Sequence, residues 1–446
     1  MIQAVVFAAR SWDRRLAGLK IIRRLVLSAR AAGAQHVFIL ADRPDAVGAA
    51  LAGLDPGTIT LAASASELAP FGGSSHGDVL VLHDEVAVDP QYLAGLVEFA
   101  APLRPGRAVL AVRDGPPPAH AMAAGVRLEG GHLKPAGQGA GLHTIGVALA
   151  PAALLAGISG DCSAAATTLR QRLDRLCSER AVEGYLEGRG YAALLQPDAS
   201  WRGAAWEMIK LAGKPTDGVV SRLVNRKVSA LVTAILVEAP IPPNAVTFSL
   251  LALGLVTGAV LLNGAPAAIF AGAALYQLNS ALDGCDGELA RLRFQTSRFG
   301  AWADSTCDLI VNLCFFVGVP LGLYHRYGGS VHLWLAALVV GGIVAVVPVV
   351  FIRSRRAGRE GDFSDFGESL ARSFRPRSFM ASLVATVSRL LRRDAYVWVF
   401  LVLAAVGADE LILELIAGGV ALHLIAVLLP STAKPKPAAV APVNLA

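Results

Sequence analysis

Long apolar segments fill the second half of this chain and limit what it can fold into. Hydrophobic residues make up 54% of the 446 residues and charged residues 17%, and residues 1–210 alone have the composition of an ordinary soluble domain. A helix needs about 20 apolar residues to cross the hydrocarbon core of a bilayer. The second half of the chain therefore predicts an all-α, six-helix transmembrane domain, with spans at residues 246–262, 267–282, 309–324, 331–352, 396–408 and 411–429.

Four aspartates lie between the second and third apolar segments. Charged groups near a membrane interior are costly, so such acids are expected to be functional. On a helix, Asp283 and Asp286 would share one face, and Gly300, Asp304 and Asp308 would share another at a spacing of four residues. The two faces could point four carboxylates at one place. Hard divalent cations, Mg²⁺ or Mn²⁺, bind to oxygen ligands of this kind.

Basic residues indicate the orientation of the predicted spans. Cytoplasmic loops carry an excess of Lys and Arg. The sequence therefore predicts a multi-pass protein of the inner (cytoplasmic) membrane, with both termini and the acidic window on the cytoplasmic side. The five cysteines form no CxxC pair, which fits reduced thiols there. The arginines that set this orientation follow spans two and four: Arg291, Arg293, Arg298, Arg353, Arg355, Arg356, Arg359, Arg389, Arg392 and Arg393.

The N-terminal half alternates short apolar runs with helical periodicity. This pattern predicts an α/β domain with a parallel sheet. Ligands bind beyond the carboxyl ends of such strands, which places residues 8–15 and 83–85 at the mouth of a site. The strands are expected at residues 4–9, 36–41, 59–62 and 78–83, and a helix at residues 19–32.

The N-terminal half resembles the sugar-phosphate nucleotidyltransferase family in residues 18–40 and 80–90. In that family a Gly-rich loop after the first strand holds the nucleotide phosphates, and Asp84 matches a metal-binding aspartate. Here the loop ARSWDRRLAG contains no glycine before Gly18, Lys20 falls too late, and residues 201–204 (WRGA) contain no second acid. We interpret the domain as a degenerate member that serves packing, dimerisation or regulation. An active cytidylyltransferase remains the alternative.

The two halves are joined by a basic amphipathic segment. Arg222, Arg226 and Lys227 recur at helical spacing, and prolines interrupt the helix at 240, 242 and 243. The segment is expected to lie on the membrane surface with its basic side toward lipid headgroups. The domain boundaries are predicted at residues 1–212 (nucleotidyltransferase-like), 213–243 (interfacial helix and linker), 244–430 (six-span domain) and 431–446 (disordered tail).

The acidic window resembles the signature of the CDP-alcohol phosphotransferase (phosphatidyltransferase) family. DGCDGELAR, eight residues and GAWADSTCD fit DxxDGxxARx8GxxxDxxxD at all fixed positions. The resemblance implies transfer of a phosphoalcohol group from a CDP-alcohol to a hydroxyl acceptor, with CMP released. It also implies roles for the residues: metal ligands Asp283, Asp286, Asp304 and Asp308, with Asp308 also the catalytic base, and CDP-alcohol contacts at Gly287, Ala290, Arg291 and Gly300.

The fusion of the two halves resembles bifunctional inositol-1-phosphate cytidylyltransferase and di-inositol-phosphate-phosphate synthases. That likeness offers an alternative in which the chain also makes its CDP-alcohol from CTP and a polyol phosphate, and it implies a homodimer. An anionic acceptor could bind Arg353, Arg355 and Arg356. Membrane lipids are expected partners and nucleic acids are not. A cation transporter is an alternative of another class, although it would spread its acids over several spans.

Overall fold

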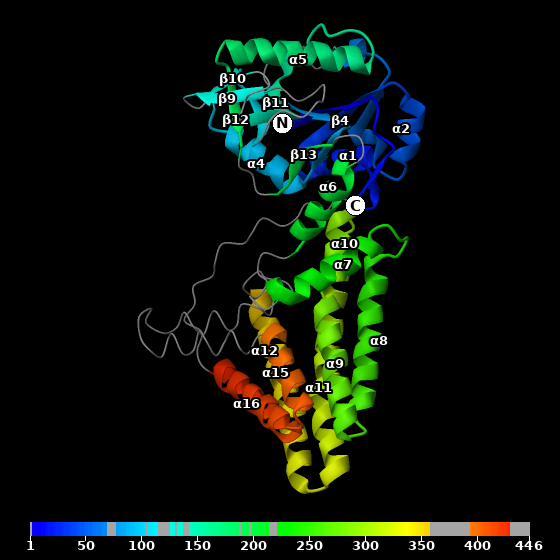
Figure 1. The fold of residues 1–446 in the computed structure, drawn as a ribbon, viewed down its shortest axis with the longest axis vertical. Helices are drawn as coiled ribbons and strands as arrows, with labels where there is room; N and C mark the ends of the chain where they lie inside the picture. Colours follow the sequence, from blue (N-terminus) through cyan, green and yellow to red (C-terminus); the bar gives the residue numbers. More distant parts are fainter. Residues whose placement is uncertain are drawn as a thin grey trace. The chain divides into compact units, whose positions relative to one another are not determined.

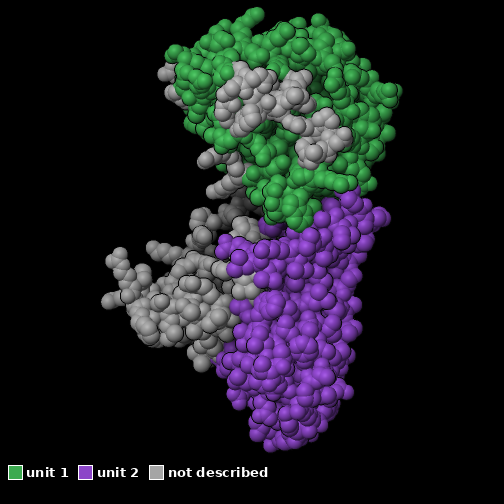
Figure 2. All heavy atoms as spheres, viewed as in Figure 1, with its two compact units in different colours: residues 1–211, 292–294, 443–446 green, residues 212–291, 295–442 purple. Residues whose placement is uncertain are grey.

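The computed structural model describes residues 2–68, 77–103, 106–114, 125–129, 132–136, 142–186, 190–195, 199–213, 221–356 and 393–428. Two compact units are present: unit 1 with residues 1–211, 292–294 and 443–446, and unit 2 with residues 212–291 and 295–442. Figure 2 colours the two units separately. The predicted tail, residues 431–446, lies outside the described residues.

Unit 1 is built on a twisted sheet with the strand order β5-β4-β1-β6-β11-β8-β12-β10-β9. β4, β1 and β6 pair in parallel, and β11 joins β6 antiparallel. The predicted parallel α/β core is therefore confirmed (Figure 1). The strands are β1 (Ile2–Ala8), β4 (Ala34–Ala41), β5 (Ile59–Ala62), β6 (Asp78–His83), β8 (Ala108–Asp114), β9 (Gly125–Glu129), β10 (His132–Pro135), β11 (Leu142–Pro151) and β12 (Val182–Tyr185).

Helices cover this sheet because each carries an apolar stripe on one side. In α1 (Ile21–Ala31), Ile22, Leu25 and Val26 are fully buried and fix the helix against the sheet. β1 and β6 are almost wholly buried, as apolar strands in the middle of a parallel sheet are. The other helices of unit 1 are α2 (Pro44–Ala50), α4 (Pro90–Ala100), α5 (Cys162–Ser178) and α6 (Ala199–Leu211).

Unit 2 is helical, and each predicted apolar segment forms a helix (Figure 1). Tyr276, Phe315 and Phe400 stack in its core, with ring centroids 4.2 and 5.5 Å apart. The helices are α7 (Arg226–Leu236), α8 (Pro243–Leu261), α9 (Pro266–Leu282), α10 (Cys285–Leu292), α11 (Arg298–Tyr327), α12 (Ser330–Arg356), α15 (Arg393–Ala405) and α16 (Asp409–Leu428).

Two of the helices in the described ranges, α8 and α11, are long and apolar enough to cross a membrane. Six spans are therefore not shown, although the described residues include a helix at each of the six predicted apolar segments. α8 and α11 pack closely through glycines: a β-carbon on Gly254 would lie 2.4 Å from Val311, and one on Gly258 would lie 3.0 Å from Cys314. Small residues four positions apart allow membrane helices this close approach.

The amphipathic segment that contains α7 was expected to turn its basic side toward lipid headgroups. In the structure, part of its polar side instead faces the interior of unit 2. Ser229 and Thr233 of α7 are buried, and Arg226 forms an ion pair inside unit 2 instead of pointing to headgroups. Leu231 and Ile235 are exposed. The reason lies in the tertiary structure: Glu288, a buried acid on α10, binds the polar side of α7.

Candidate active site

The acidic motif is placed by two helix ends. α9 ends at Leu282, and Asp283 is its C-cap residue. α10 follows after Gly284, and the chain then turns before α11 begins at Arg298. Ser297 caps α11, because its hydroxyl accepts the Gly300 amide at 2.9 Å. α11, which contains the third predicted span, therefore starts early enough to carry Gly300 and the two aspartates that follow.

Three aspartates come together between these helices. Asp304 and Asp308 lie one turn apart on α11, and Asp283 approaches from the end of α9. Each offers one carboxylate oxygen, and these oxygens all lie within 4.8 Å of one another. All three residues are half-buried. Three hard oxygen donors that converge in this way fit Mg²⁺ or Mn²⁺.

Arg393, the first residue of α15, provides the positive charge beside this cluster. Its Nη1 donates to Asp308 at 2.6 Å and to Asp283 at 3.3 Å, and its Nη2 donates to Asn279 at 3.0 Å. From the sequence, Arg393 was expected only to contribute to the membrane orientation. Its position at the first turn of an apolar segment was the available signal, but the pairing with α9 and α11 depends on how the helices pack.

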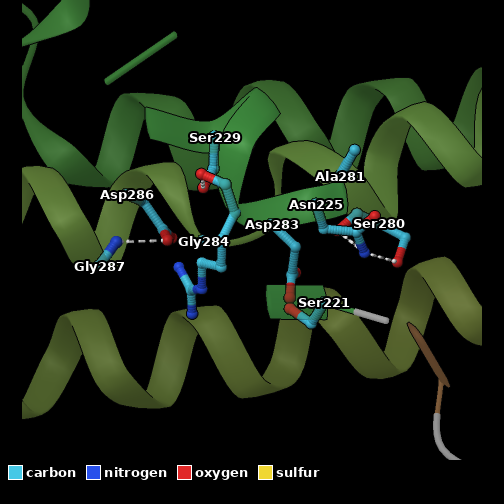
Figure 3. A pocket seen from close by; sticks show the side chains of 10 residues that line it. Ser221, Asn225, Ser229, Ser280, Ala281, Asp283, Gly284, Asp286 and Gly287 are labelled. Carbon is cyan, nitrogen blue, oxygen red and sulfur yellow. Dashed lines mark hydrogen bonds between the residues drawn. The ribbon is translucent and has the colours of Figure 1, made fainter. Parts of the chain in front are cut away.

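Asp286, the fourth aspartate, is buried and has different partners. Its Oδ2 accepts a hydrogen bond from the Thr247 hydroxyl of α8, and its Oδ1 accepts the Gly287 amide at 2.6 Å (Figure 3). The break at Gly284 separates Asp283 from Asp286, so the two do not continue along one helical face. Within the described chain, Asp286 is not a member of the three-aspartate group.

The other motif residues surround these acids. Arg291 donates from Nε to the Ala212 carbonyl at 2.5 Å, and a β-carbon on Gly287 would lie 3.1 Å from its Nη1. A β-carbon on Gly300 would lie 3.3 Å from Asn244 Oδ1. Ala290 is half-buried. The small residues thus leave room for neighbouring polar groups.

A polar pocket opens between α7 and the motif (Figure 3). Asp283 belongs both to this pocket and to the three-aspartate cluster, so the two features adjoin. The lining residues are Ser221, Asn225, Arg226, Ser229, Ser280, Ala281, Asp283, Gly284, Asp286 and Gly287. The side chains of Arg353, Arg355 and Arg356, at the end of α12, lie outside the described residues.

The predicted mouth of unit 1 is occupied by its own loop. Asp84, directly after β6, is buried and accepts the amides of Arg10 at 2.8 Å and Ser11 at 2.7 Å. Burial raises the pKa of the Asp84 carboxyl to about 6. The Arg14 guanidinium lies 4.3 Å from the ring centroid of Trp201, at the segment where a second metal-binding acid was sought. These contacts hold the loop after β1 against the end of β6 and against α6.

Comparison with known proteins places the motif in a family context. Residues 241–409 match the family described as CDP-alcohol phosphatidyltransferase. A bifunctional IPC transferase and DIPP synthase of Thermococcus kodakarensis is 35% identical over 163 residues, 36% of each chain. A protein of the same name from Aquifex aeolicus is 36% identical over 128 residues, 29% of this chain and 28% of the relative.

A shorter relative and a solved structure complete the comparison. A phosphatidylinositol phosphate synthase of Corynebacterium glutamicum is 29% identical over 153 residues, 34% of this chain and 66% of the relative. A UDP-glucose pyrophosphorylase from Acinetobacter baumannii superposes with a TM-score of 0.34 at 12% identity and covers 46% of this chain and 93% of its own. The matches to the two bifunctional relatives span about a third of those relatives' length. The family match, which contains the whole acidic motif, shows that the C-terminal part of this chain is a CDP-alcohol phosphatidyltransferase domain.

Proposed function

We propose that this protein is a membrane enzyme that transfers a phosphoalcohol group from a CDP-alcohol to a hydroxyl acceptor. The observation that carries the proposal is the group formed by Asp283, Asp304 and Asp308 beside a polar pocket, inside the segment that matches the family. Such a reaction must balance the charge of a diphosphate in a partly buried place. Carboxylates grouped in this way suit a divalent cation that performs this task.

The proposed reaction forms one phosphorus–oxygen bond and breaks another. The acceptor oxygen attacks the β-phosphorus of the CDP-alcohol, the bond between that phosphorus and the bridging oxygen breaks, and CMP leaves. Asp308 takes the proton of the acceptor hydroxyl. Mg²⁺ or Mn²⁺ held by Asp283, Asp304 and Asp308 would neutralise the diphosphate when bound. Asp286 is proposed as a further ligand, while Gly287, Ala290, Arg291 and Gly300 are proposed to admit and hold the CDP-alcohol.

The setting of this reaction is also a proposal. We infer a multi-pass protein of the inner membrane with six spans and a cytoplasmic active site, supported by the six apolar helices and the basic residues near the motif. Homodimerisation is supported by the family resemblance. Binding of an anionic acceptor by Arg353, Arg355 and Arg356 is supported by their charge and their place at the end of the fourth apolar segment. The proposed domain boundaries remain those predicted from the sequence. The division of the structure at residue 211 supports the first of these proposed boundaries.

Substrate screening with purified full-length protein tests the proposal. CMP release is followed with CDP-diacylglycerol, CDP-inositol and other CDP-alcohols, each with hydroxyl acceptors and Mg²⁺ or Mn²⁺. Asp304→Asn and Asp308→Asn should each lower turnover by at least about 100-fold, and chelation of the metal should abolish it. Asp174→Asn, on the surface of α5, serves as the control. Full activity of the Asp304 or Asp308 variant would refute the proposed site. Ion flux without CMP release would favour the transporter alternative.

A second activity, synthesis of the CDP-alcohol by unit 1, is suggested by the names of the bifunctional relatives. The contacts of Asp84 with Arg10 and Ser11 argue against it, because they use this carboxylate to hold a loop that contains no glycine before Gly18. The full chain incubated with CTP, Mg²⁺ and inositol phosphate should therefore release no pyrophosphate. Release that disappears in Asp84→Asn would establish the second activity.

A further inference from the structure

Glu288, which the family signature leaves unspecified, binds α7 to the motif through three hydrogen bonds. Its Oε1 accepts from Arg226 Nη1 at 2.5 Å and from the Ser229 hydroxyl at 2.8 Å, and its Oε2 accepts from the Thr233 hydroxyl at 2.6 Å. The Glu288 side chain is only 2% exposed. A carboxylate this deeply buried is costly unless it is paired and hydrogen-bonded, and here both oxygens are.

Arg226 is held by this carboxylate at the wall of the polar pocket. Its neighbours there include Gly284 and two aspartates of the motif, Asp283 and Asp286. A β-carbon on Gly284 would lie 2.3 Å from Arg226 Nη1, so the glycine provides the space that the guanidinium occupies. The result is a positive charge fixed beside two carboxylates at the place where the pocket meets the motif.

A fixed arginine at this place suits an anionic ligand. The pocket is polar but contributes two carboxylates of its own, so a diphosphate that enters it needs positive charge on more than one side. A cation at the three-aspartate cluster would supply charge from the α11 side, and Arg226 supplies it from the α7 side. The planar guanidinium matches phosphate oxygens geometrically, which an ammonium group does not.

We propose that Arg226 is a further substrate-binding residue, which contacts the phosphates of the CDP-alcohol, and that Glu288 is the positioning residue that holds it there. This inference rests on the proposed function. It also gives α7 a task beyond contact with the membrane surface, since the helix forms one wall of the active site. Lys227, the exposed neighbour of Arg226 on α7, has no such role.

Binding of CDP to the full-length protein, measured by calorimetry in the presence of Mg²⁺, tests the inference. Arg226→Gln should weaken CDP binding about 10- to 100-fold, as expected for loss of hydrogen bonds to a charged group. Arg226→Lys should fall between this variant and the wild type. Glu288→Gln should weaken binding about 3- to 10-fold in the wild-type background and hardly at all in Arg226→Gln, because it acts through the arginine.

Binding of Mn²⁺ alone separates this role from a merely structural one. The three-aspartate cluster should bind Mn²⁺ with its affinity unchanged within about threefold in every variant, whereas a disrupted fold would lose both ligands. Lys227→Gln is the matched control and should bind CDP as the wild type does. Wild-type-like CDP affinity in both Arg226 variants, or loss of Mn²⁺ binding together with CDP binding, would overturn the inference. A wild-type protein that binds no CDP and releases no CMP would instead refute the proposed function.

Discussion

Arg393→Gln is expected to strengthen binding of a divalent cation to the three-aspartate cluster. The guanidinium donates to Asp308 at 2.6 Å and to Asp283 at 3.3 Å, and these two carboxylates are among the three proposed metal ligands. A cation that takes the same oxygens must displace these contacts or tolerate a positive charge next to it. Glutamine removes the charge and keeps a polar side chain of similar length.

The size of the effect follows from the geometry. Two unit charges about 4 Å apart interact by about 4 kcal/mol at an effective dielectric constant of about 20, which is an upper limit here. The Arg393 side chain is 18% exposed and that of Asp308 34% exposed, so solvent reduces this value. Hydrogen bonds to charged groups contribute about 1.5–3 kcal/mol net. When these hydrogen bonds no longer compete with the cation for the carboxylate oxygens, the metal dissociation constant should fall about 10- to 100-fold.

Titration of the detergent-solubilised protein with Mn²⁺, followed by electron paramagnetic resonance in the absence of nucleotide, measures this constant directly. Arg326→Gln is the matched control, because Arg326 also pairs with an aspartate of unit 2, at 3.1 Å from Asp409 and away from the motif. Its metal affinity should equal that of the wild type. Unchanged or weaker Mn²⁺ binding in a folded Arg393→Gln protein would refute the idea that the arginine and the metal compete for the same oxygens.

Three other variants test separate parts of the structure. Thr247→Val removes the hydroxyl that donates to Asp286, and kcat/KM for CMP release should fall about tenfold or more, while wild-type kinetics would contradict a role for this contact. Gly264→Ala should lower the thermal midpoint of unfolding by several degrees more than Gly407→Ala. Both glycines have left-handed φ angles, but only at 264 would a β-carbon meet a backbone oxygen of α11, at 1.9 Å. Equal shifts of the two midpoints would contradict this expectation. In unit 1, burial raises the pKa of Asp84 from 3.8 to about 6, so the protonated carboxyl favours the folded state. This contribution is fully present below pH 3.8, and the free energy of unfolding should decline by up to about 3 kcal/mol as the pH rises through 6. Asp84→Asn should flatten this decline in pH-dependent unfolding curves.

The local elements and the chemistry of the motif could be predicted from the order of residues along the chain. Apolar runs of helical length became helices, with α9 at residues 266–282 against a predicted 267–282. The buried strands β1 and β6 likewise follow from short apolar runs between polar turns. Spacing alone put Asp304 and Asp308 on one face of α11. These properties depend on neighbours a few residues apart, so the chain order already contains them.

Which charges form pairs depends on how the helices pack and could not be predicted from the sequence. The break at Gly284 sends Asp283 to the α11 aspartates and Asp286 to Thr247, and no helical projection of residues 283–291 distinguishes these outcomes. Arg226 and Arg393 were assigned to headgroups and to topology, yet each pairs with an acid at least 60 residues away in sequence, at separations of 62 and 85 residues. Burial explains the difference, since a charge excluded from water takes the nearest opposite charge that packing brings to it, whatever its place in the chain.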